Sequence, residues 1–311
     1  MELQLALGSM RIHPPSVVRG EDSKAMRESR PYDIAVVILT WNSALCIGPC
    51  LDSLERAARV LRLLVCVVDN GSCDGTRRIL ETWGRRETHL YLETIYLDKN
   101  IGTTRSRNLG IRRVAQKAES LCILDSDTEI TAEALLELKR VLAAHPSAGI
   151  VGPVLRGKDG SVQNSGRALP TLPQKILKVL PLRSLRRWGE TQEEIQKPPG
   201  VVVPVGYLMS ACWLMPMALP KTIGLLDENI FYAPEDVEYC LRAWKHGYAV
   251  LYDGKTSIVH EWQRISRCRL FSRHNWEHLK GLIYFFWKYR YCLTRPVLPC
   301  DRKGASKEES S

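Results

Sequence analysis

Five side chains stand out because their types and spacing could do chemistry together. Asp125 and Asp127 end one apolar run, Glu235 and Asp236 are adjacent at the start of a helix-like run, and His260 ends another apolar run. Carboxylate oxygens suit Mg²⁺ or Mn²⁺, cations that also bind diphosphate oxygens, and one neutral imidazole could complete such a site. The alternatives are a turn before a helix for the Asp pair and a structural role for the histidine.

The adjacent acids Glu235 and Asp236 follow Pro234, and this position gives them a specific electrostatic setting. Proline suits the first helical turn because its missing N–H costs nothing there. The positive end of the helix dipole favours the ionised carboxylate, which can accept a proton at neutral pH. Consecutive helical residues point about 100° apart, so we expect only one acid to face a ligand and the other to support it. For an isolated pair, ordinary helix-start chemistry is the alternative.

Apolar strands and amphipathic helices alternate through the first half of the chain. The strand-like runs are DIAVVILT (33–40), LRLLVCVVDN (61–70), YLETIYL (91–97) and SLCILDSD (120–127). Helical spacing follows each of them, in 43–60, 73–84, 103–118 and 131–146. This order predicts an α/β fold in which helices flank a mostly parallel central sheet. Because ligands bind at the carboxyl ends of such strands, the polar clusters 40–42, 69–76 and 125–129 should open on one rim.

The second half has a different pattern. Residues 155–204 contain several Pro and Gly and a short basic amphipathic stretch, which predicts a long excursion or lid. GYLMSACWLMPMAL (206–219) favours a strand. After the helix that begins at Pro234, YAVLY (248–252) and TSIVH (256–260) favour two short strands. An amphipathic stretch, 275–291, closes the fold.

In combination, these motifs resemble the family 2 glycosyltransferases, inverting enzymes with the Rossmann-like GT-A fold. The matching segments run in family order from about residue 33 to residue 260: VVILTWNSALCIGPCLDSL, VVDNGSCDGT, NIGTTRSRNLG, LDSDTEI, IGLLDENIFYAPEDVEYCLRAWKHGY and VH. Within the family, DGSVQNSGRALPTL and the segment around Glu235 look most like the rhamnosyltransferase-type branch. The chain has DSD where many relatives have DDD or DAD, which should be harmless because the outer carboxylates bind.

The resemblance implies a role for each matching residue. Asp127 and His260 match the ligands of a divalent metal, Mn²⁺ or Mg²⁺, and Asp236 matches the catalytic base, with Glu235 as its partner. The residues that match the nucleotide-sugar site are Thr40, Asn42, Asp69, Asn100, Gly102, Arg107 and, at the ribose, Asp125. The implied reaction transfers a sugar from a nucleotide-diphosphate donor to a hydroxyl of a glycan or lipid-linked glycan, with inversion.

The acceptor side is predicted from aromatic and basic residues. Trp213 and Trp262 could stack on a sugar ring, or lie in the core. Arg264 and Arg267 could close over the diphosphate, with a solvated basic surface as the alternative. The amphipathic stretch 275–291 suits either an interfacial helix at an anionic membrane or a terminal helix docked on the body.

Three regions follow along the 311 residues. We expect a flexible tail (1–30), a GT-A domain (31–262) and a basic C-terminal lid, amphipathic helix and tail (263–311). The domain would comprise a nucleotide-binding half (31–150) and a smaller acceptor half (151–262).

Composition and motif content limit the remaining interpretations of function and location. The formal charge of +10 suits phosphate-bearing partners. No zinc spacing, RNP-like motif or helix-turn-helix pattern occurs, so no nucleic-acid partner is expected, although a nucleic-acid-binding protein stays an alternative. A GT-A-like nucleotidyltransferase is a second alternative and an inactive scaffold a third. Scattered cysteines, no secretion signal and no long apolar run predict reduced thiols and a cytoplasmic protein, with peripheral attachment to the inner face of the membrane open.

Overall fold

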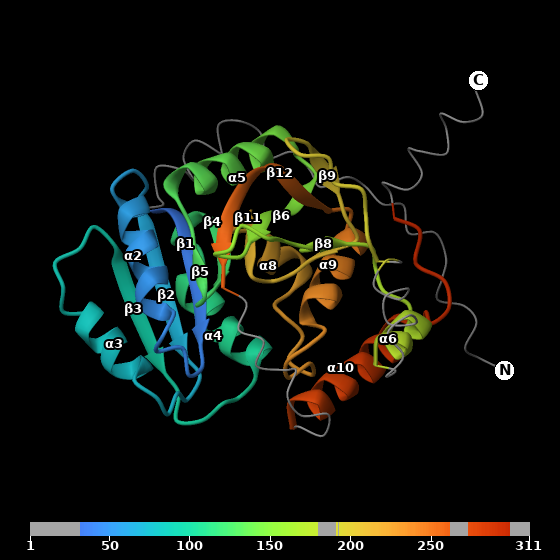
Figure 1. Cartoon of the computed structure of the whole chain (residues 1–311), viewed down its shortest axis with the longest axis horizontal. Helices are drawn as coiled ribbons and strands as arrows, with labels where there is room; N and C mark the ends of the chain where they lie inside the picture. Colours follow the sequence, from blue (N-terminus) through green and yellow to red (C-terminus); the bar gives the residue numbers. More distant parts are fainter. Residues whose placement is uncertain (1–31, 180–190, 192, 262–272, 299–311) are drawn as a thin grey trace.

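A ten-stranded sheet forms the centre of the computed structural model, which describes residues 32–179, 191, 193–261 and 273–298. Figure 1 shows this sheet between layers of helices. The predicted tail, 1–30, and three predicted site residues, Trp262, Arg264 and Arg267, lie outside the described residues.

The first half folds as the alternation of apolar runs predicts. β1 (Tyr32–Thr40), β2 (Leu63–Asp69), β3 (Tyr91–Tyr96) and β4 (Ala118–Asp125) are parallel and lie in the order β3-β2-β1-β4. The interior of β1, all of β2 and most of β4 are buried, because helices cover both faces of this part of the sheet. The connecting helices are α2 (Ile47–Ala58), α3 (Thr76–Trp83), α4 (Thr103–Val114) and α5 (Ala132–Ala144).

The second half extends the same sheet beyond β4. β11 (Cys212–Pro216) pairs antiparallel with β4 and β6 (Ala148–Arg156), and β12 (Ala249–His260) runs parallel to β6. β5 (Thr128–Glu129) pairs with the last residues of β12. The short strands β7 (Val162–Gln163) and β9 (Val202–Pro204) pair with β6 and β12. β8 (Gly166–Arg167) and β10 (Tyr207–Leu208) pair with each other in a separate two-stranded sheet. The functional division at residue 150 stays a prediction.

The strands of the second half differ from the sequence-based predictions in three places. The expected strands 248–252 and 256–260 are one strand, β12, whose pairing with β6 shifts register between Asp253 and Ser257. The segment 206–219 contains two strands, β10 and β11, in place of one. β6 was not predicted, although its run AGIVGPVL is apolar and almost wholly buried.

The last helix is docked on the body by its inner face. α10 (Arg273–Tyr289) buries Leu282, Phe285 and Phe286, and Lys288 Nζ donates to Glu238 Oε1 of α9 (Glu235–Lys245) over 2.8 Å. Figure 1 shows α10 beside α6 (Leu172–Val179), while α8 (Leu219–Ile223) lies nearer the sheet. No helix of the described residues combines the length and the apolar composition needed to cross a bilayer.

Gly281 allows α10 to pack directly on the backbone that precedes α9. A Cβ added there would lie 2.1 Å from the carbonyl oxygen of Ala233. Alanine gains about 0.8–1 kcal/mol over glycine inside a helix. Overpacking against backbone, which no rotamer change relieves, costs about 1–3 kcal/mol. We therefore expect Gly281→Ala to lower the melting temperature.

Gly48 is the matched control, because it also lies in a helix, α2, and an added Cβ would meet nothing within 4 Å. Gly48→Ala should leave the melting temperature unchanged or raise it. A melting temperature that rises equally in both variants would contradict the close packing of α10 on Ala233.

Candidate active site

One cavity of about 500 Å³ opens at the carboxyl ends of β1, β2 and β4. Its wall includes Trp41 after β1, Asn70 after β2 and Asp125 at the end of β4. The predicted common rim is therefore confirmed. The second half of the chain closes the cavity with Glu235 and Asp236 from α9 and His260 from β12.

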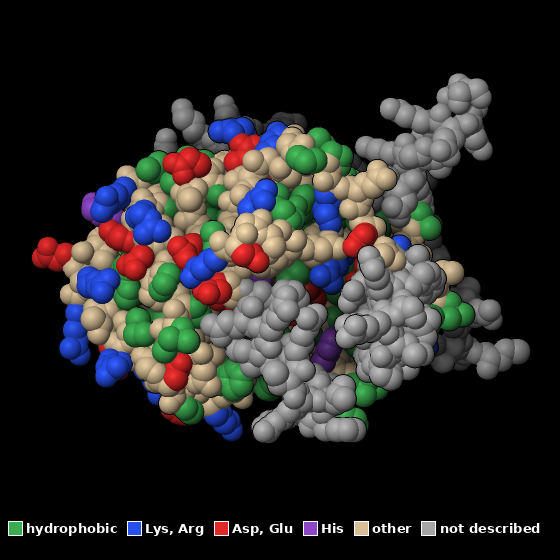
Figure 2. All heavy atoms as spheres, viewed as in Figure 1, with side chains coloured by type: hydrophobic (Ala, Val, Ile, Leu, Met, Phe, Trp, Pro, Cys, Tyr) green, Lys and Arg blue, Asp and Glu red, His purple; other side chains and the backbone are tan. Residues whose placement is uncertain are grey.

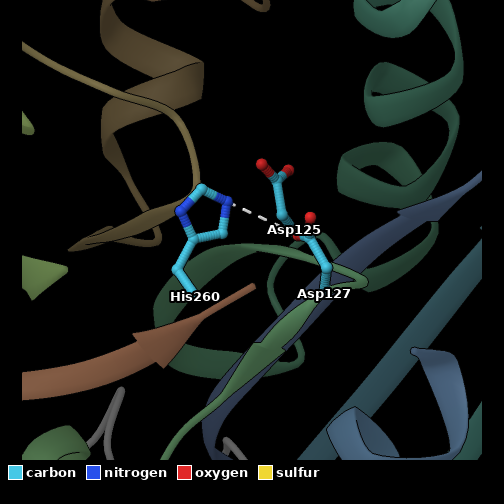
Figure 3. Close-up of side chains that lie close together, drawn as sticks. All are labelled: Asp125, Asp127 and His260. Carbon is cyan, nitrogen blue, oxygen red and sulfur yellow. Dashed lines mark ion pairs between the residues drawn. The ribbon is translucent and has the colours of Figure 1, made fainter. Parts of the chain in front are cut away.

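Asp125, Asp127 and His260 form a cluster suited to a divalent cation. Each offers one ligand atom, and these atoms all lie within 4.8 Å of one another. Figure 3 shows the imidazole and the two carboxylates facing one another, with His260 Nε2 3.5 Å from Asp127 Oδ1. The pairing of β5 with β12 holds this geometry, because His260 pairs with Thr128, the residue after Asp127.

Gln163 fixes the orientation of the His260 ring. The Gln163 amide donates from Nε2 to the His260 carbonyl oxygen over 2.8 Å, so its Oε1 faces His260 Nδ1 at 2.6 Å. An amide oxygen only accepts, so the proton is on Nδ1 and the Nε2 lone pair points to the carboxylates. Burial lowers the pKa of His260, which favours the neutral imidazole that binds metals. Two hard carboxylates and one neutral imidazole fit Mn²⁺ or Mg²⁺.

Arg107 of α4 links Asp125 at the end of β4 to Glu235 at the start of α9. Its guanidinium donates from Nη2 to Asp125 Oδ1 at 2.5 Å and from Nη1 to Glu235 Oε1 at 3.3 Å. Ser210 Oγ, 2.8 Å from Nη1, also donates to Glu235 Oε1 over 3.1 Å. Arg107 is almost fully buried, so it acts as a bridge that fixes both acids.

Glu235 and Asp236 both border the cavity, although we expected only one to face it. Burial, and then the charge of Asp236, raise the pKa of Glu235 to about 8. Burial also raises the pKa of Asp236, against the opposing backbone N–H of Val237. The expectation that the helix start favours ionisation is therefore wrong in its net direction, because desolvation outweighs the dipole. A raised pKa makes the ionised carboxylate a stronger base.

Asn100 and Gly102 border the cavity on the loop before α4, and their contact with a nucleotide sugar stays a prediction. Asn100 Oδ1 accepts from the backbone N–H of Gly102 over 2.9 Å and from Asn70 Nδ2 over 3.1 Å. Gly102 has φ +96°, and a Cβ there would lie 2.6 Å from the Phe231 carbonyl oxygen. Glycine is thus required where this loop meets the segment that leads into α9.

Thr40, Asn42 and Asp69 lie behind the cavity wall. Thr40 Oγ1 donates to Asp69 Oδ1 over 3.2 Å, and both residues are fully buried. Asn42 Oδ1 accepts from the backbone N–H of Cys73 over 2.9 Å. These bonds hold the loops after β1 and β2, and direct contact of the three residues with a nucleotide stays a prediction.

Trp213 is not an acceptor contact. It is fully buried in β11 and stacks on Tyr239 of α9, with ring centroids 5.8 Å apart. The alternative reading, a core tryptophan, is correct.

Sequence reasoning missed Trp41 and Tyr232, which border the cavity with 47% and 38% of their surface exposed. Trp41 lies in the polar cluster 40–42, and Tyr232 lies in the family-matching segment that contains Glu235. Only their polar neighbours were assigned roles.

Comparison with known proteins finds relatives that are glycosyltransferases by name, two of them rhamnosyltransferases. The N-acetylglucosaminyl-diphospho-decaprenol L-rhamnosyltransferase of Mycobacterium tuberculosis is 24% identical over 238 residues, which cover 73% of this chain and 75% of the relative. The dTDP-rhamnosyl transferase RfbF of Shigella flexneri is 27% identical over 229 residues, 73% of this chain and 69% of the relative.

Solved structures of glycosyltransferases share the fold. Residues 1–349 of S. aureus TarS superpose with a TM-score of 0.52 at 21% identity, over 74% of this chain and 60% of that one. The mannosyltransferase PcManGT from Pyrobaculum calidifontis, in complex with GDP-Man and Mn²⁺, gives 0.55 at 18% identity, over 89% and 72%. This chain thus spans less than two thirds of the TarS segment.

The family model for glycosyl transferase family 2 matches residues 35–204, more than half of the chain. The matched region contains most of β1, all of β2 to β4 and the cavity residues Asp125 and Asp127, and the fold is that of the GT-A glycosyltransferases. The resemblance drawn from the motifs is confirmed: the chain belongs to glycosyl transferase family 2.

Proposed function

We propose that this chain is an inverting, metal-dependent glycosyltransferase that moves a sugar from a nucleotide-diphosphate donor to a hydroxyl of a glycan or lipid-linked glycan. The observation that carries the proposal is the convergence of two acidic groups on one cavity. Asp125, Asp127 and His260 form one group, Glu235 and Asp236 form the other, and Arg107 joins Asp125 to Glu235.

Asp127 and His260 would hold Mn²⁺ or Mg²⁺, with Asp125 at the donor ribose. A divalent cation held there would neutralise charge on the diphosphate leaving group. Asp236 takes the proton of the acceptor hydroxyl while that oxygen attacks the anomeric carbon. The bond from this carbon to the diphosphate oxygen breaks, and its electron pair leaves with the nucleotide diphosphate. Attack from the face opposite the leaving group inverts the configuration in one displacement.

Asp236 is better suited than Glu235 to act as this base. Glu235 Oε1 accepts from Arg107 Nη1 and from Ser210 Oγ, so this carboxylate is already engaged in the wall of the cavity. Asp236 Oδ1 accepts from the Val237 backbone N–H over 2.8 Å, which orients the carboxylate at the start of α9. Glu235 is then a supporting residue that ties the start of α9 to Arg107.

The relatives make rhamnose the first sugar to test. Two of them are rhamnosyltransferases by name, one with a dTDP donor and the other with a decaprenol-linked acceptor. We propose a dTDP-rhamnose donor and a lipid-linked acceptor for this chain, acting on the cytoplasmic face of a membrane.

A thermal-shift panel of UDP-, GDP- and dTDP-sugars, each with and without Mn²⁺, tests the proposal. A ligand that binds only the folded state adds about 2.7 kcal/mol of stability at a hundred times its Kd. We expect dTDP-rhamnose with Mn²⁺ to raise the melting temperature most, and dTDP-rhamnose alone to raise it less. A panel without any shift would contradict the function, and a shift independent of Mn²⁺ would contradict the metal site.

The nucleic-acid and nucleotidyltransferase alternatives are less favoured. Membership of a glycosyltransferase family supports sugar transfer over both. On the face shown in Figure 2, basic and acidic side chains of the described residues are interspersed, whereas a duplex-binding face gathers basic residues along one stripe. Filter binding with generic RNA and DNA separates nucleic-acid binding from sugar transfer.

A further inference from the structure

The outer face of α10 carries a continuous apolar stripe, which we call the α10 stripe: Trp276, Leu279, Ile283 and Trp287. These side chains are 58%, 46%, 62% and 64% exposed. Their spacing of three, four and four residues places them on one side of the helix, over about 17 Å. A neighbouring side, which carries Leu282, Phe285 and Phe286, is already buried against the body. Both sides of α10 are therefore apolar, and a helix of that kind is normally covered all round.

Basic groups flank the α10 stripe. The Lys280 ammonium stands 5.8 Å from the Trp276 ring centroid, and the Arg290 guanidinium stands 5.9 Å from that of Trp287. Lys288 is instead turned inward, to Asp227 and Glu238. The sequence from 264 to 295 contains eight Lys or Arg and one acid, Glu277. Tryptophan and leucine beside lysine and arginine are typical of helices that lie in the interface of an anionic bilayer.

The helix that carries the α10 stripe also borders the active-site cavity. Glu277, one residue after Trp276, borders the active-site cavity. Gly281, two residues before Ile283, packs on the backbone that leads to Glu235 and Asp236. A surface bound to the α10 stripe would therefore lie at the mouth of the cavity that contains the proposed base.

We propose that the α10 stripe binds an anionic lipid bilayer and presents the cavity to acceptors held in that bilayer. This inference rests on the proposed function, whose acceptor is lipid-linked. A second copy of the chain is a poorer occupant, because an isologous contact would bring two basic-flanked stripes face to face. An anionic bilayer satisfies both the apolar face and the charges around it.

Sedimentation of the full chain with lipid vesicles tests this proposal. We expect binding to vesicles of phosphatidylcholine mixed with phosphatidylglycerol, and weaker binding to phosphatidylcholine alone or at high salt. Leu279→Gln/Ile283→Gln removes the centre of the stripe with helix-compatible side chains, and should lower the vesicle partition coefficient about tenfold or more. Val60→Gln/Val162→Gln is the matched control, because these valines are 66% and 59% exposed elsewhere, and it should bind like the wild type.

Two results would overturn the proposal: no vesicle binding by the wild type, or equal binding by the stripe variant. Sedimentation equilibrium without lipid tests whether a second copy of the chain binds the stripe. If the wild type forms a dimer that Leu279→Gln/Ile283→Gln dissociates, the stripe is assigned to a second copy instead. The thermal shift with dTDP-rhamnose and Mn²⁺, measured on the same samples, reports on the active site separately. A retained shift without vesicle binding refutes the membrane surface alone, and vesicle binding without a shift refutes the proposed function alone.

Discussion

Asp236→Asn is expected to lower kcat by about 10²- to 10⁴-fold, the range that general base catalysis contributes. The substitution keeps the size of the side chain and removes its ability to accept a proton. Asp236 borders the cavity, and burial raises the pKa of its carboxyl, so the wild-type group is a stronger base than an exposed aspartate. Donor binding should be unchanged, because other residues, among them Asp125 and Asp127, are the expected donor contacts.

The measurement is a single-turnover rate together with donor affinity by calorimetry, since only their combination separates the chemical step from binding. Asp52→Asn is the control: Asp52 is an exposed carboxylate in α2, 54% accessible and 3.8 Å from Arg86. It should keep both the rate and the affinity. If Asp236→Asn retained most of the wild-type rate, the base would be another group, and Glu235→Gln would be the next variant to measure.

The first four strands could be predicted because their signal is local. β1, β2 and β4 are buried on both faces, so each appears in the sequence as an unbroken apolar run, with a helical pattern after it. β6 has a similar apolar run, but it follows α5 closely and contains Gly149, Gly152 and Pro153, which indicate a loop. β12 was divided in two for the same reason: Asp253-Gly254 is a typical turn signal, yet pairing with β6 resumes at Ser257. Long-range pairing outweighed the local turn signal.

The convergence of the acids could be predicted because strand ends share one edge of a parallel sheet. What the sequence could not supply is the bridging contact of Arg107, since it depends on how α4 and α9 face each other across the cavity. The prediction that Trp213 contacts the acceptor failed for a related reason. An aromatic residue in an apolar run fits a core and a cleft equally well, and only its burial in the fold decides between them. The pKa direction of Asp236 also needed the fold, because desolvation depends on everything packed around α9.

Asp127→Ala is expected to weaken Mn²⁺ binding by at least about 100-fold, since loss of an outer-shell partner alone costs about 10- to 100-fold. The variant should also lose the Mn²⁺-dependent part of donor affinity. The fold should survive: the side chain is partly exposed, and the bond from the Glu261 backbone N–H to the Asp127 carbonyl, 2.8 Å, involves only main-chain atoms. Calorimetric titration with Mn²⁺, then with dTDP-rhamnose at saturating Mn²⁺, measures both effects.

Glu261→Ala separates coordination from general loss of negative charge near the site. Glu261 follows His260 directly, but it is 51% exposed and pairs with Lys158 at 2.6 Å, outside the three-residue cluster. Both variants remove one carboxylate, so long-range electrostatics alone would weaken Mn²⁺ binding in both to a similar, small extent. Direct coordination predicts a large loss for Asp127→Ala only. Equal affinities in the two variants would place the cation elsewhere, and His260 would then be a structural histidine held by Gln163.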